Sequence, residues 1–281
     1  MLDLVKAVEA GLRAMPDDWD DSALHISDLG AAIEGEGCLR QVWLRINGAE
    51  RKEDTPGQRF MFMQGHRIHE LIPEIWTLPS GWDVEDIECA ASLNGVTGRS
   101  DCVLRDDSNY RVVVDFKTVR GNAFKYLDTP KPSHVAQVQG YMLALGADAG
   151  KILYADREGQ NGFLQFDVDP DTLETEHRVS QLLALPVRTV APPMLEPKVK
   201  VRACKNDYSV YVSNPWNCSY CAYCGVSCDG AVPADSQSEG VCGKAWRGGE
   251  GKLCVEWKDG YPDRVHNSAV EQLETLMPEA K

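Results

Sequence analysis

The chain has few basic residues for its size and no long apolar run. Its 281 residues contain 29 lysines and arginines against 43 aspartates and glutamates, so its net charge is −14. A broad nonspecific nucleic-acid surface is normally basic, and this total argues against one. No stretch of about eighteen apolar residues could span a membrane. The start, Met1 to Leu4, also lacks the basic and apolar segments of a secretion signal, so we expect a cytoplasmic protein without a membrane partner.

Two further features are absent from the sequence. No internal repeat is visible, so the chain is expected to fold as one elaborated domain or as a core with an appendage. No phosphate-binding loop of the form GxxxxGK[ST] occurs either. Helicase activity would therefore need another chain, for example a recombination or helicase partner protein. The oligomeric state cannot be predicted from these features.

Cysteine, in contrast, is abundant. A reducing compartment keeps thiols free, so ten cysteines in an intracellular chain argue for metal or cluster binding rather than for disulfides. Four of them fall within eleven residues: Cys218, Cys221, Cys224 and Cys228. This spacing lets one segment wrap a metal, and it is compatible with both zinc and an iron–sulfur cluster.

The tripeptide Asp115-Phe116-Lys117 ends an apolar run that predicts a β-strand over 110–117. Because side chains alternate along a strand, Asp115 and Lys117 share one face and Phe116 points to the other. A carboxylate and an ammonium two residues apart can bind a divalent cation and steady a phosphate, which is the minimum equipment for phosphodiester hydrolysis. A solvated strand face is the alternative interpretation of the tripeptide alone.

A second predicted strand ends at Arg105, and the turn-forming residues after it return the chain as an antiparallel hairpin. If Arg105 faces Arg111, then Asp101 lies opposite Asp115 on the same face. Paired carboxylates repel unless a cation lies between them. A slip of one residue would separate the two side chains.

Helical spacing places three more polar residues at candidate positions. His69 shares the inward side of a predicted helix with Ile72, where core packing and metal binding are both open to it. Gln137 and Tyr141 are four residues apart and emerge together beside an apolar stripe.

The predicted elements mix helices and strands, which favours an α/β fold with a central mixed sheet flanked by helices. Helices are expected at 2–14, 38–44, 57–78, 133–145 and 170–185, and strands at 82–93, 102–105, 110–117, 151–155 and 162–168. We expect three regions: an N-terminal helical region (1–56) carrying Cys38, an α/β core (57–190) and a Cys-rich region (191–281).

The last region begins after a proline-rich linker and has an irregular, glycine-rich sequence. A small hairpin is expected from 252–258 and 263–266, and Cys242, Cys254 and His266 are candidates for a second metal site. A basic cluster precedes the cysteines and could track a phosphate backbone or form a solvated face. Its members are Lys198, Lys200, Arg202 and Lys205.

Four ordered motifs resemble those of RecB-type nucleases in the PD-(D/E)xK superfamily. They are Gly65-x-x-x-His69, Gly98-x-x-Asp101, Asp115-x-Lys117-Thr118 and Gln137-x-x-x-Tyr141. With Cys38 upstream and the cysteine cluster downstream, the sequence is similar to the iron–sulfur branch, which includes the AddB nuclease domain and the CRISPR-associated adaptation exonucleases. The resemblance implies a restriction-endonuclease-like core.

The resemblance also implies residue roles. The implied metal ligands for Mg²⁺ or Mn²⁺ are His69, Asp101, Asp115 and the Phe116 carbonyl, the catalytic residue is Lys117, and the residues that order the site and contact DNA are Gln137 and Tyr141. Asp115 departs from the glutamate that is frequent at its position, but the strand face is unchanged.

For the cluster, the resemblance implies one ligand before the nuclease motifs and three after them. The ligands of a [4Fe-4S] cluster would be Cys38, Cys218, Cys221 and Cys228, with one extra residue in the last gap. Cys224 is surplus or a substitute ligand. A zinc site built from the four clustered cysteines alone is the alternative.

The resulting expectation is a metal-dependent exonuclease on single-stranded DNA ends, active in recombination, repair or phage DNA processing. Arg40, Arg67 and Lys125 could thread the strand despite the acidic total. Two alternatives remain: a non-catalytic DNA-binding or assembly module of the same fold, and an iron–sulfur sensor protein.

Overall fold

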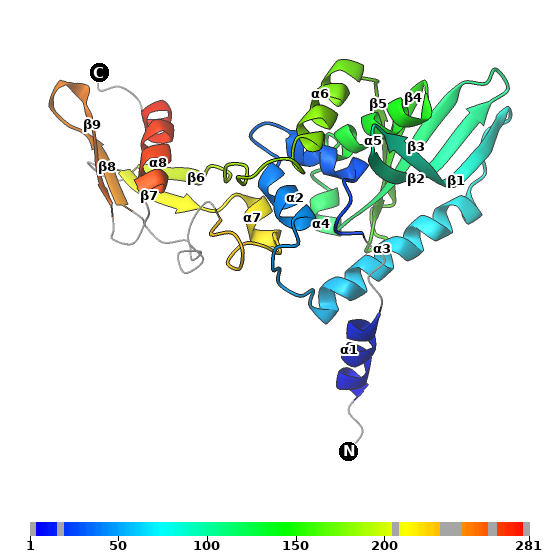
Figure 1. Cartoon of the computed structure of the whole chain (residues 1–281), viewed down its shortest axis with the longest axis horizontal. Coiled ribbons are helices and arrows are strands. Elements are labelled where there is room, and N and C mark those ends of the chain that lie inside the picture. Colours follow the sequence, from blue (N-terminus) through cyan, green and yellow to red (C-terminus); the bar gives the residue numbers. More distant parts are fainter. Residues whose placement is uncertain (1–3, 16–19, 204–207, 231–242, 258–262, 278–281) are drawn as a thin grey trace. The chain divides into compact units, whose positions relative to one another are not determined.

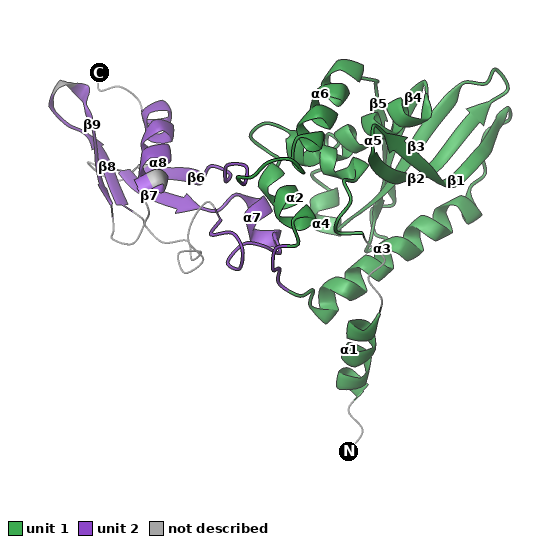
Figure 2. Cartoon of the chain, in the orientation of Figure 1, with its two compact units in different colours: residues 1–48, 53–190 green, residues 49–52, 191–281 purple. Residues whose placement is uncertain are grey.

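The structure is a computed structural model of the chain and describes residues 4–15, 20–203, 208–230, 243–257 and 263–277. The chain forms two compact units, drawn in green and purple in Figure 2. Unit 1 comprises residues 1–48 and 53–190, and unit 2 comprises residues 49–52 and 191–281. No helix among the described residues is both long enough and apolar enough to cross a membrane.

Unit 1 is built on a five-stranded mixed sheet (Figure 1). Its strands, in spatial order, are β1 (Trp82–Leu93), β2 (Val96–Asp106), β3 (Arg111–Val119), β4 (Ala149–Asp156) and β5 (Phe163–Val168). The pairs β1–β2, β2–β3 and β4–β5 are antiparallel, and β3–β4 is parallel. All five strands were predicted from the sequence, although β2 is longer at both ends than the predicted strand 102–105.

Unit 1 also contains the helices α1 (Leu4–Ala14), η1 (Ile26–Ala32), α2 (Leu39–Ile46), α3 (Pro56–Ile75), α4 (Gly121–Phe124), α5 (Pro132–Leu145) and α6 (Thr172–Leu183). Helices α3 and α5 pack against the sheet, whereas α1 packs against α3. Local sequence explains the ends of two of them. Thr55 and Gln58 form a capping box at the start of α3. Helix α5 begins with a proline at its first position and ends at Gly146, which has the left-handed conformation that glycine tolerates best.

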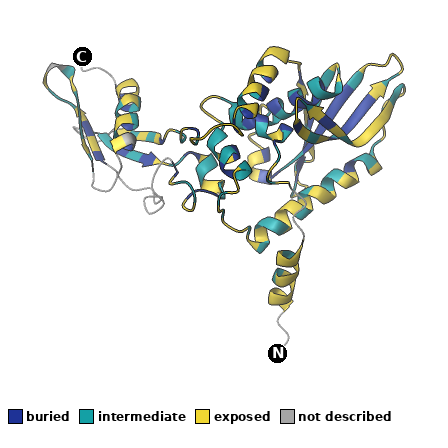
Figure 3. Ribbon diagram, in the orientation of Figure 1, coloured by how far each residue is buried: buried dark blue, intermediate teal, exposed yellow. Residues whose placement is uncertain are grey.

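The two faces of the sheet bury different side chains. Val113 packs in the core cluster that contains Val138 of α5. Val114 and Phe116 alternate with it and pack in a second cluster with Ile72 of α3. Figure 3 shows buried residues concentrated in the central strands between these helices. The fold is therefore α/β with a mixed central sheet flanked by helices, as the sequence predicts.

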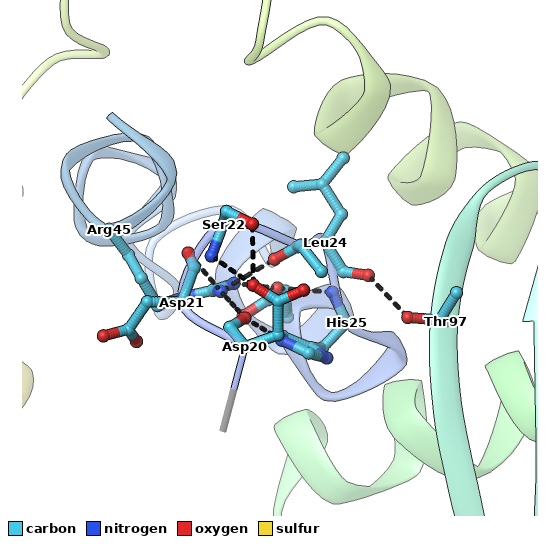
Figure 4. Close-up of polar contacts among 9 residues, drawn as sticks. Asp20, Asp21, Ser22, Leu24, His25, Arg45 and Thr97 are labelled. Carbon is cyan, nitrogen blue, oxygen red and sulfur yellow. Dashed lines mark hydrogen bonds and ion pairs between the residues drawn. The ribbon is translucent and has the colours of Figure 1, made fainter. Parts of the chain in front are cut away.

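Polar contacts fix the segment before η1 (Figure 4). The Arg45 guanidinium donates to the carbonyl oxygens of Asp21 and Ala23 and pairs with Asp28 at 2.5 Å. The Thr97 N–H donates to the Leu24 carbonyl. These contacts fasten the N-terminal segment both to α2 and to the start of β2.

Unit 2 contains a second, antiparallel sheet backed by one helix. Its elements are β6 (Lys198–Ala203), β7 (Tyr208–Ser213), α7 (Trp216–Tyr220), β8 (Gly243–Arg247), η3 (Gly249–Gly251), β9 (Leu253–Trp257) and α8 (Asp263–Leu276). The sheet order is β6-β7-β8-β9. Val210 and Ala245 pack in one core cluster with Val265, Ala269 and Leu273 of α8.

The hairpin predicted from 252–258 and 263–266 is wrong. Strand β9 pairs with β8, and residues 263–276 form α8 because their apolar residues recur every four positions and face the sheet. Of the candidate second metal site, Cys242 lies outside the described residues, as does Lys205 of the basic cluster. The His266 ring stacks on Trp257 with centroids 4.9 Å apart.

Candidate functional site

The β2–β3 hairpin has the predicted register. Arg105 pairs with Arg111, and the ladder continues to Cys102 opposite Val114. The turn is held by Asp106, whose Oδ1 accepts hydrogen bonds from the N–H groups of Ser108 and Tyr110. The next position in this register sets Asp101 opposite Asp115, so the two carboxylates belong to one face of adjacent strands.

The Asp101 carboxylate links β3 to α3. Its Oδ2 accepts a hydrogen bond from the Phe116 N–H at 2.5 Å, just beyond the last backbone pair of β2 and β3. Its Oδ1 lies 3.2 Å from Nδ1 of His69. The His69 ring stands edge-on to Phe116 with centroids 5.9 Å apart. The helix therefore delivers the imidazole to the same place as the strand carboxylate.

Asp115 is the most buried charged side chain of the site, with 2% of its side chain exposed. Lys117 Nζ forms an ion pair with its Oδ2 at 2.8 Å. Burial raises the pKa of Asp115 to about 6; the Lys117 ammonium opposes this shift by its charge and by a hydrogen bond, and the Asp101 carboxylate adds to the shift. Lys117 therefore compensates the buried charge of Asp115 only in part.

Gln137 and Tyr141 lie together on α5, where Gln137 Nε2 donates to the Tyr141 hydroxyl at 3.2 Å. Burial raises the pKa of Tyr141, and this phenol stays protonated. Gly98 of β2 lets the ring approach, because a Cβ at position 98 would lie 3.0 Å from Tyr141 Cε1. The glycine of the second motif therefore has a packing role.

Two polar residues beside Lys117 were missed. Tyr154 of β4 pairs with Lys117 across the parallel ladder, and its hydroxyl lies 2.8 Å from His134 Nδ1. Burial lowers the pKa of His134 to about 3, and the nearby ammonium groups of Lys117 and Lys131 lower it further. The imidazole is therefore neutral at pH 7. His134 could have been found from its spacing of three and seven residues from Gln137 and Tyr141, whereas Tyr154 needed the β3–β4 pairing.

The donor set fits a hard divalent cation in its chemistry, since carboxylate oxygens with one imidazole suit Mg²⁺ and Mn²⁺. The buried Asp115 carboxylate, whose pKa stays raised despite the Lys117 ammonium, is consistent with a cation ligand. The side chains nevertheless form two separate pairs, His69 with Asp101 and Lys117 with Asp115. Within the described ranges, no group of three or more His, Cys, Asp or Glu is placed so that it could hold a metal ion.

The four clustered cysteines lie along one short segment of unit 2 and, like the other described residues, do not form a group of three or more metal ligands. The backbones of Cys224 and Cys228 pair in an isolated β-bridge, and the Gly230 N–H donates to Cys228 Sγ at 3.4 Å. Burial raises the pKa of the Cys224 thiol, and the three neighbouring cysteines raise it further. All four thiols are free of disulfides. Cys38 lies at the N-cap of α2 in unit 1.

The basic residues predicted to thread a strand all belong to unit 1. Arg40 lies in α2, Arg67 in α3 and Lys125 at the C-cap of α4. Arg67 and Lys125 are exposed. Arg67 pairs with Glu70 at 2.6 Å on the same helix. Surface pairs of this kind are weak, so Arg67 is accessible to a phosphate.

Two aspartates and a lysine beside one another on the central hairpin of a mixed sheet are chemically suited to phosphodiester cleavage. The family model described as the PD-(D/E)XK nuclease superfamily matches residues 25–228, and the chain belongs to that superfamily. It is therefore a hydrolase that acts on DNA.

Several solved structures are similar to this chain. The protein SSO0001 is 17% identical, with a TM-score of 0.45 over 78% of this chain and 91% of that one. An alkaline exonuclease from Laribacter hongkongensis is 13% identical (TM-score 0.43; 64% and 90% covered). A phage-related exonuclease from Haemophilus somnus 129PT is 13% identical (TM-score 0.42; 58% and 92% covered). No curated protein matches the chain.

Proposed function

We propose that this protein is a divalent-metal-dependent exonuclease that degrades single-stranded DNA from its ends. The observation that carries the proposal is the β2–β3 hairpin, whose register opposes Asp101 and Asp115 and brings Lys117 to 2.8 Å from Asp115. Opposed carboxylates on a rigid hairpin are suited to hold a cation, and a neighbouring ammonium is suited to meet the charge of a phosphate.

In this proposal His69, Asp101, Asp115 and the Phe116 carbonyl hold Mg²⁺ or Mn²⁺. When bound, the cation polarises the scissile phosphate and lowers the pKa of a water. Lys117 leaves its ion pair with Asp115 to orient the attacking water or to stabilise negative charge on the phosphate. Asp101 keeps β3 in place through its hydrogen bond from the Phe116 N–H.

The DNA contacts follow from the surrounding helices. Gln137 and Tyr141 order the α5 side of the site, and Arg40, Arg67 and Lys125 bind the phosphates of the incoming strand. The biological setting is recombination, repair or phage DNA processing, in which a helicase partner would supply single strands.

The finer proposal for the cysteines is a structural [4Fe-4S] cluster with the ligands Cys38, Cys218, Cys221 and Cys228. The short spacing of the four cysteines along the chain supports cluster or metal binding there. Cys224 is an alternative ligand, and a zinc ion held by the four cysteines of unit 2 is the alternative centre.

The decisive experiment measures nucleotide release from end-labelled single-stranded DNA with Mn²⁺. Removing the ammonium in Lys117→Ala should lower the rate by at least 100-fold, the size of effect expected for one transition-state donor. Lys151→Ala is the matched control, because Lys151 is also a strand lysine paired with an aspartate, Asp167. Equal rates for wild type and Lys117→Ala would sink the mechanism and favour the non-catalytic DNA-binding module.

A further inference from the structure

In the described part of unit 2, the sheet has one face that does not pack against α8. Its inner face carries Val199 and Val201 of β6 and Val210 and Val212 of β7, which pack with α8. Side chains alternate along each strand, so the residues between these valines point away from α8. The outward positions of the described strands are Lys198, Lys200, Arg202, Ser209, Tyr211, Ser213, Lys244, Trp246, Cys254 and Glu256.

This outer face is basic in a chain that is strongly acidic. Four of its described residues are basic and exposed: Lys198, Lys200, Arg202 and Lys244. Glu256, on β9 at the far edge of the sheet, is the one acidic residue among those outward positions. The whole chain has a net charge of −14, whereas the outward positions of this face have an excess of three positive charges. Charge complementarity therefore points to a polyanion as its partner.

The basic residues have a regular spacing. Lys198, Lys200 and Arg202 alternate along β6, so their Cα atoms are about 6.6 Å apart. That distance is comparable with the spacing of successive phosphates in an extended single strand. The strand register places Arg202 beside Ser209, and Ser209 beside Lys244. A row of basic and hydroxyl side chains therefore crosses the sheet from β6 to β8.

Two aromatic rings lie among these charges. Tyr211 is partly exposed, and the Arg202 guanidinium lies over its ring at 5.3 Å from the centroid. Trp246 of β8 is 37% exposed although it is among the largest apolar side chains. Basic side chains interleaved with exposed rings are the equipment of single-strand binding surfaces, where bases stack on the rings and phosphates meet the ammonium groups.

We propose that the outer face of the β6–β9 sheet binds single-stranded DNA at a site separate from the nuclease centre. A base can stack on Tyr211 or Trp246 only if its face is not already stacked on neighbouring bases. A single strand offers such bases more readily than a duplex does, so we expect single-stranded DNA. The proposal deepens the exonuclease function and rests on it for the choice of DNA. A tethered second site raises the effective concentration of the strand at the enzyme without taking part in hydrolysis.

The test measures binding apart from cleavage. A fluorescent single-stranded oligonucleotide is titrated with the full chain without added divalent cation, at several salt concentrations, and anisotropy is recorded. The variant Lys198→Thr/Lys200→Thr/Lys244→Thr should bind at least tenfold more weakly at low salt. Its slope of log affinity against log salt should shrink by about 2, since each lost phosphate contact on a single strand contributes about 0.7.

Two matched variants separate a specific face from total charge. Lys6→Gln/Arg13→Gln/Arg188→Gln removes the same charge from exposed positions of unit 1 and should bind like wild type. Lys198→Arg/Lys200→Arg/Lys244→Arg keeps the charge on the face and should also bind like wild type.

Trp246→Thr tests stacking. It should weaken single-strand binding by roughly 5- to 150-fold, the range for one stacked base, and leave duplex binding unchanged. Equal affinity of the wild type and the threonine triple variant would overturn the proposal, as would tighter binding of duplex than of single strand. Loss of cleavage in Lys117→Ala with intact binding tests the exonuclease function separately.

Discussion

At the scale of single residues, Asp115 shows a conflict between stability and function. Its carboxylate is buried and close to a second carboxylate, and burial raises its pKa to about 6. At pH 7 its charge therefore costs folding free energy, which Lys117 offsets only in part. Strained electrostatics of this kind are frequent at functional sites.

Replacing that charge should stabilise the metal-free protein. We expect Asp115→Asn to raise the free energy of unfolding at pH 7 by about 1 kcal/mol, because the amide is neutral at the same size. Wild type should gain stability when Mn²⁺ is added, by about 2.7 kcal/mol at 100 times its Kd, and the variant should gain much less. Urea unfolding with and without Mn²⁺ measures both effects. Asp167→Asn on exposed β5 is the control, and an equal response to Mn²⁺ in both variants would argue against Asp115 as a ligand.

His134 predicts a pH effect. Its pKa is about 3 in the folded chain and about 6.5 when unfolded. Below pH 6.5, His134 is therefore protonated in the unfolded chain. In the folded chain it stays neutral down to about pH 3. Stability should fall through this window as the pH drops, by roughly 1 kcal/mol per pH unit from this residue alone.

The variant His134→Gln isolates that contribution, because glutamine can still bond the Tyr154 hydroxyl and does not titrate. Unfolding free energies from pH 7 to pH 4.5 should decline less steeply in the variant than in wild type. Two parallel profiles would show that His134 is charged in the folded protein or exposed to solvent.

The candidate site residues were predictable where local periodicity carried the information. Strand alternation gave the shared face of Asp115 and Lys117, and the turn sequence gave the register that opposes Asp101 to Asp115. Tyr154 was not predictable, because it reaches Lys117 only through the parallel pairing of β3 with β4. That pairing joins segments separated by a helix, and no local pattern encodes it.

At the scale of elements, the contact between β2 and α5 is tight. Gly98 faces Tyr141, and a methyl group there would lie 3.0 Å from the ring and 3.1 Å from Ile26 Cβ. The Tyr141 ring is 3% exposed and packed on all sides, so it has little room to withdraw. Element packing thus holds the α5 residues in line with the β2–β3 hairpin.

Gly98→Ala should therefore destabilise the protein by about 1–3 kcal/mol through overpacking and should lower the cleavage rate by displacing Tyr141. Gly57→Ala in α3 is the control, since its nearest neighbour would be Thr55 Oγ1 at 3.9 Å and alanine favours a helix. Chemical denaturation and the nuclease assay check both variants. A neutral Gly98→Ala would mean that β2 and α5 can separate without cost.

Most elements of unit 1 were predictable to within a few residues, although β2 begins six residues before the predicted strand 102–105 and α4 was not predicted. The elements of unit 2 were mostly missed. The signals were present: Val199 and Val201 alternate in β6, and Val265, Ala269 and Leu273 recur every four residues in α8. The cysteines, glycines and prolines between them suggested an irregular, metal-held segment. Short strands joined by glycine-rich turns bury their apolar faces only after assembly, which a single window of sequence does not reveal.

At the scale of the whole molecule, the proposed [4Fe-4S] cluster and the alternative zinc ion differ in their visible absorbance. Protein purified without oxygen should absorb visible light if it carries the [4Fe-4S] cluster, and Cys38→Ser should remove that absorbance. Cys224→Ser should keep it if Cys224 is surplus. A colourless protein that binds one zinc and tolerates Cys38→Ser would replace the cluster with the zinc centre of unit 2.

The path of the chain between the two units affects the order in which the protein can fold during synthesis. Residues 49–52 belong to unit 2, where the Lys52 N–H donates to the Ala222 carbonyl and Ser227 Oγ donates to the Glu50 carbonyl. These partners are separated by about 170 positions, so on the ribosome the early segment must wait for the cysteine loop to be synthesised. Unit 1 can complete its sheet sooner. Synthesis therefore imposes an order in which the nuclease fold forms before unit 2 is complete, and a chain cut off before the cysteines would leave those early backbone groups without their native partners.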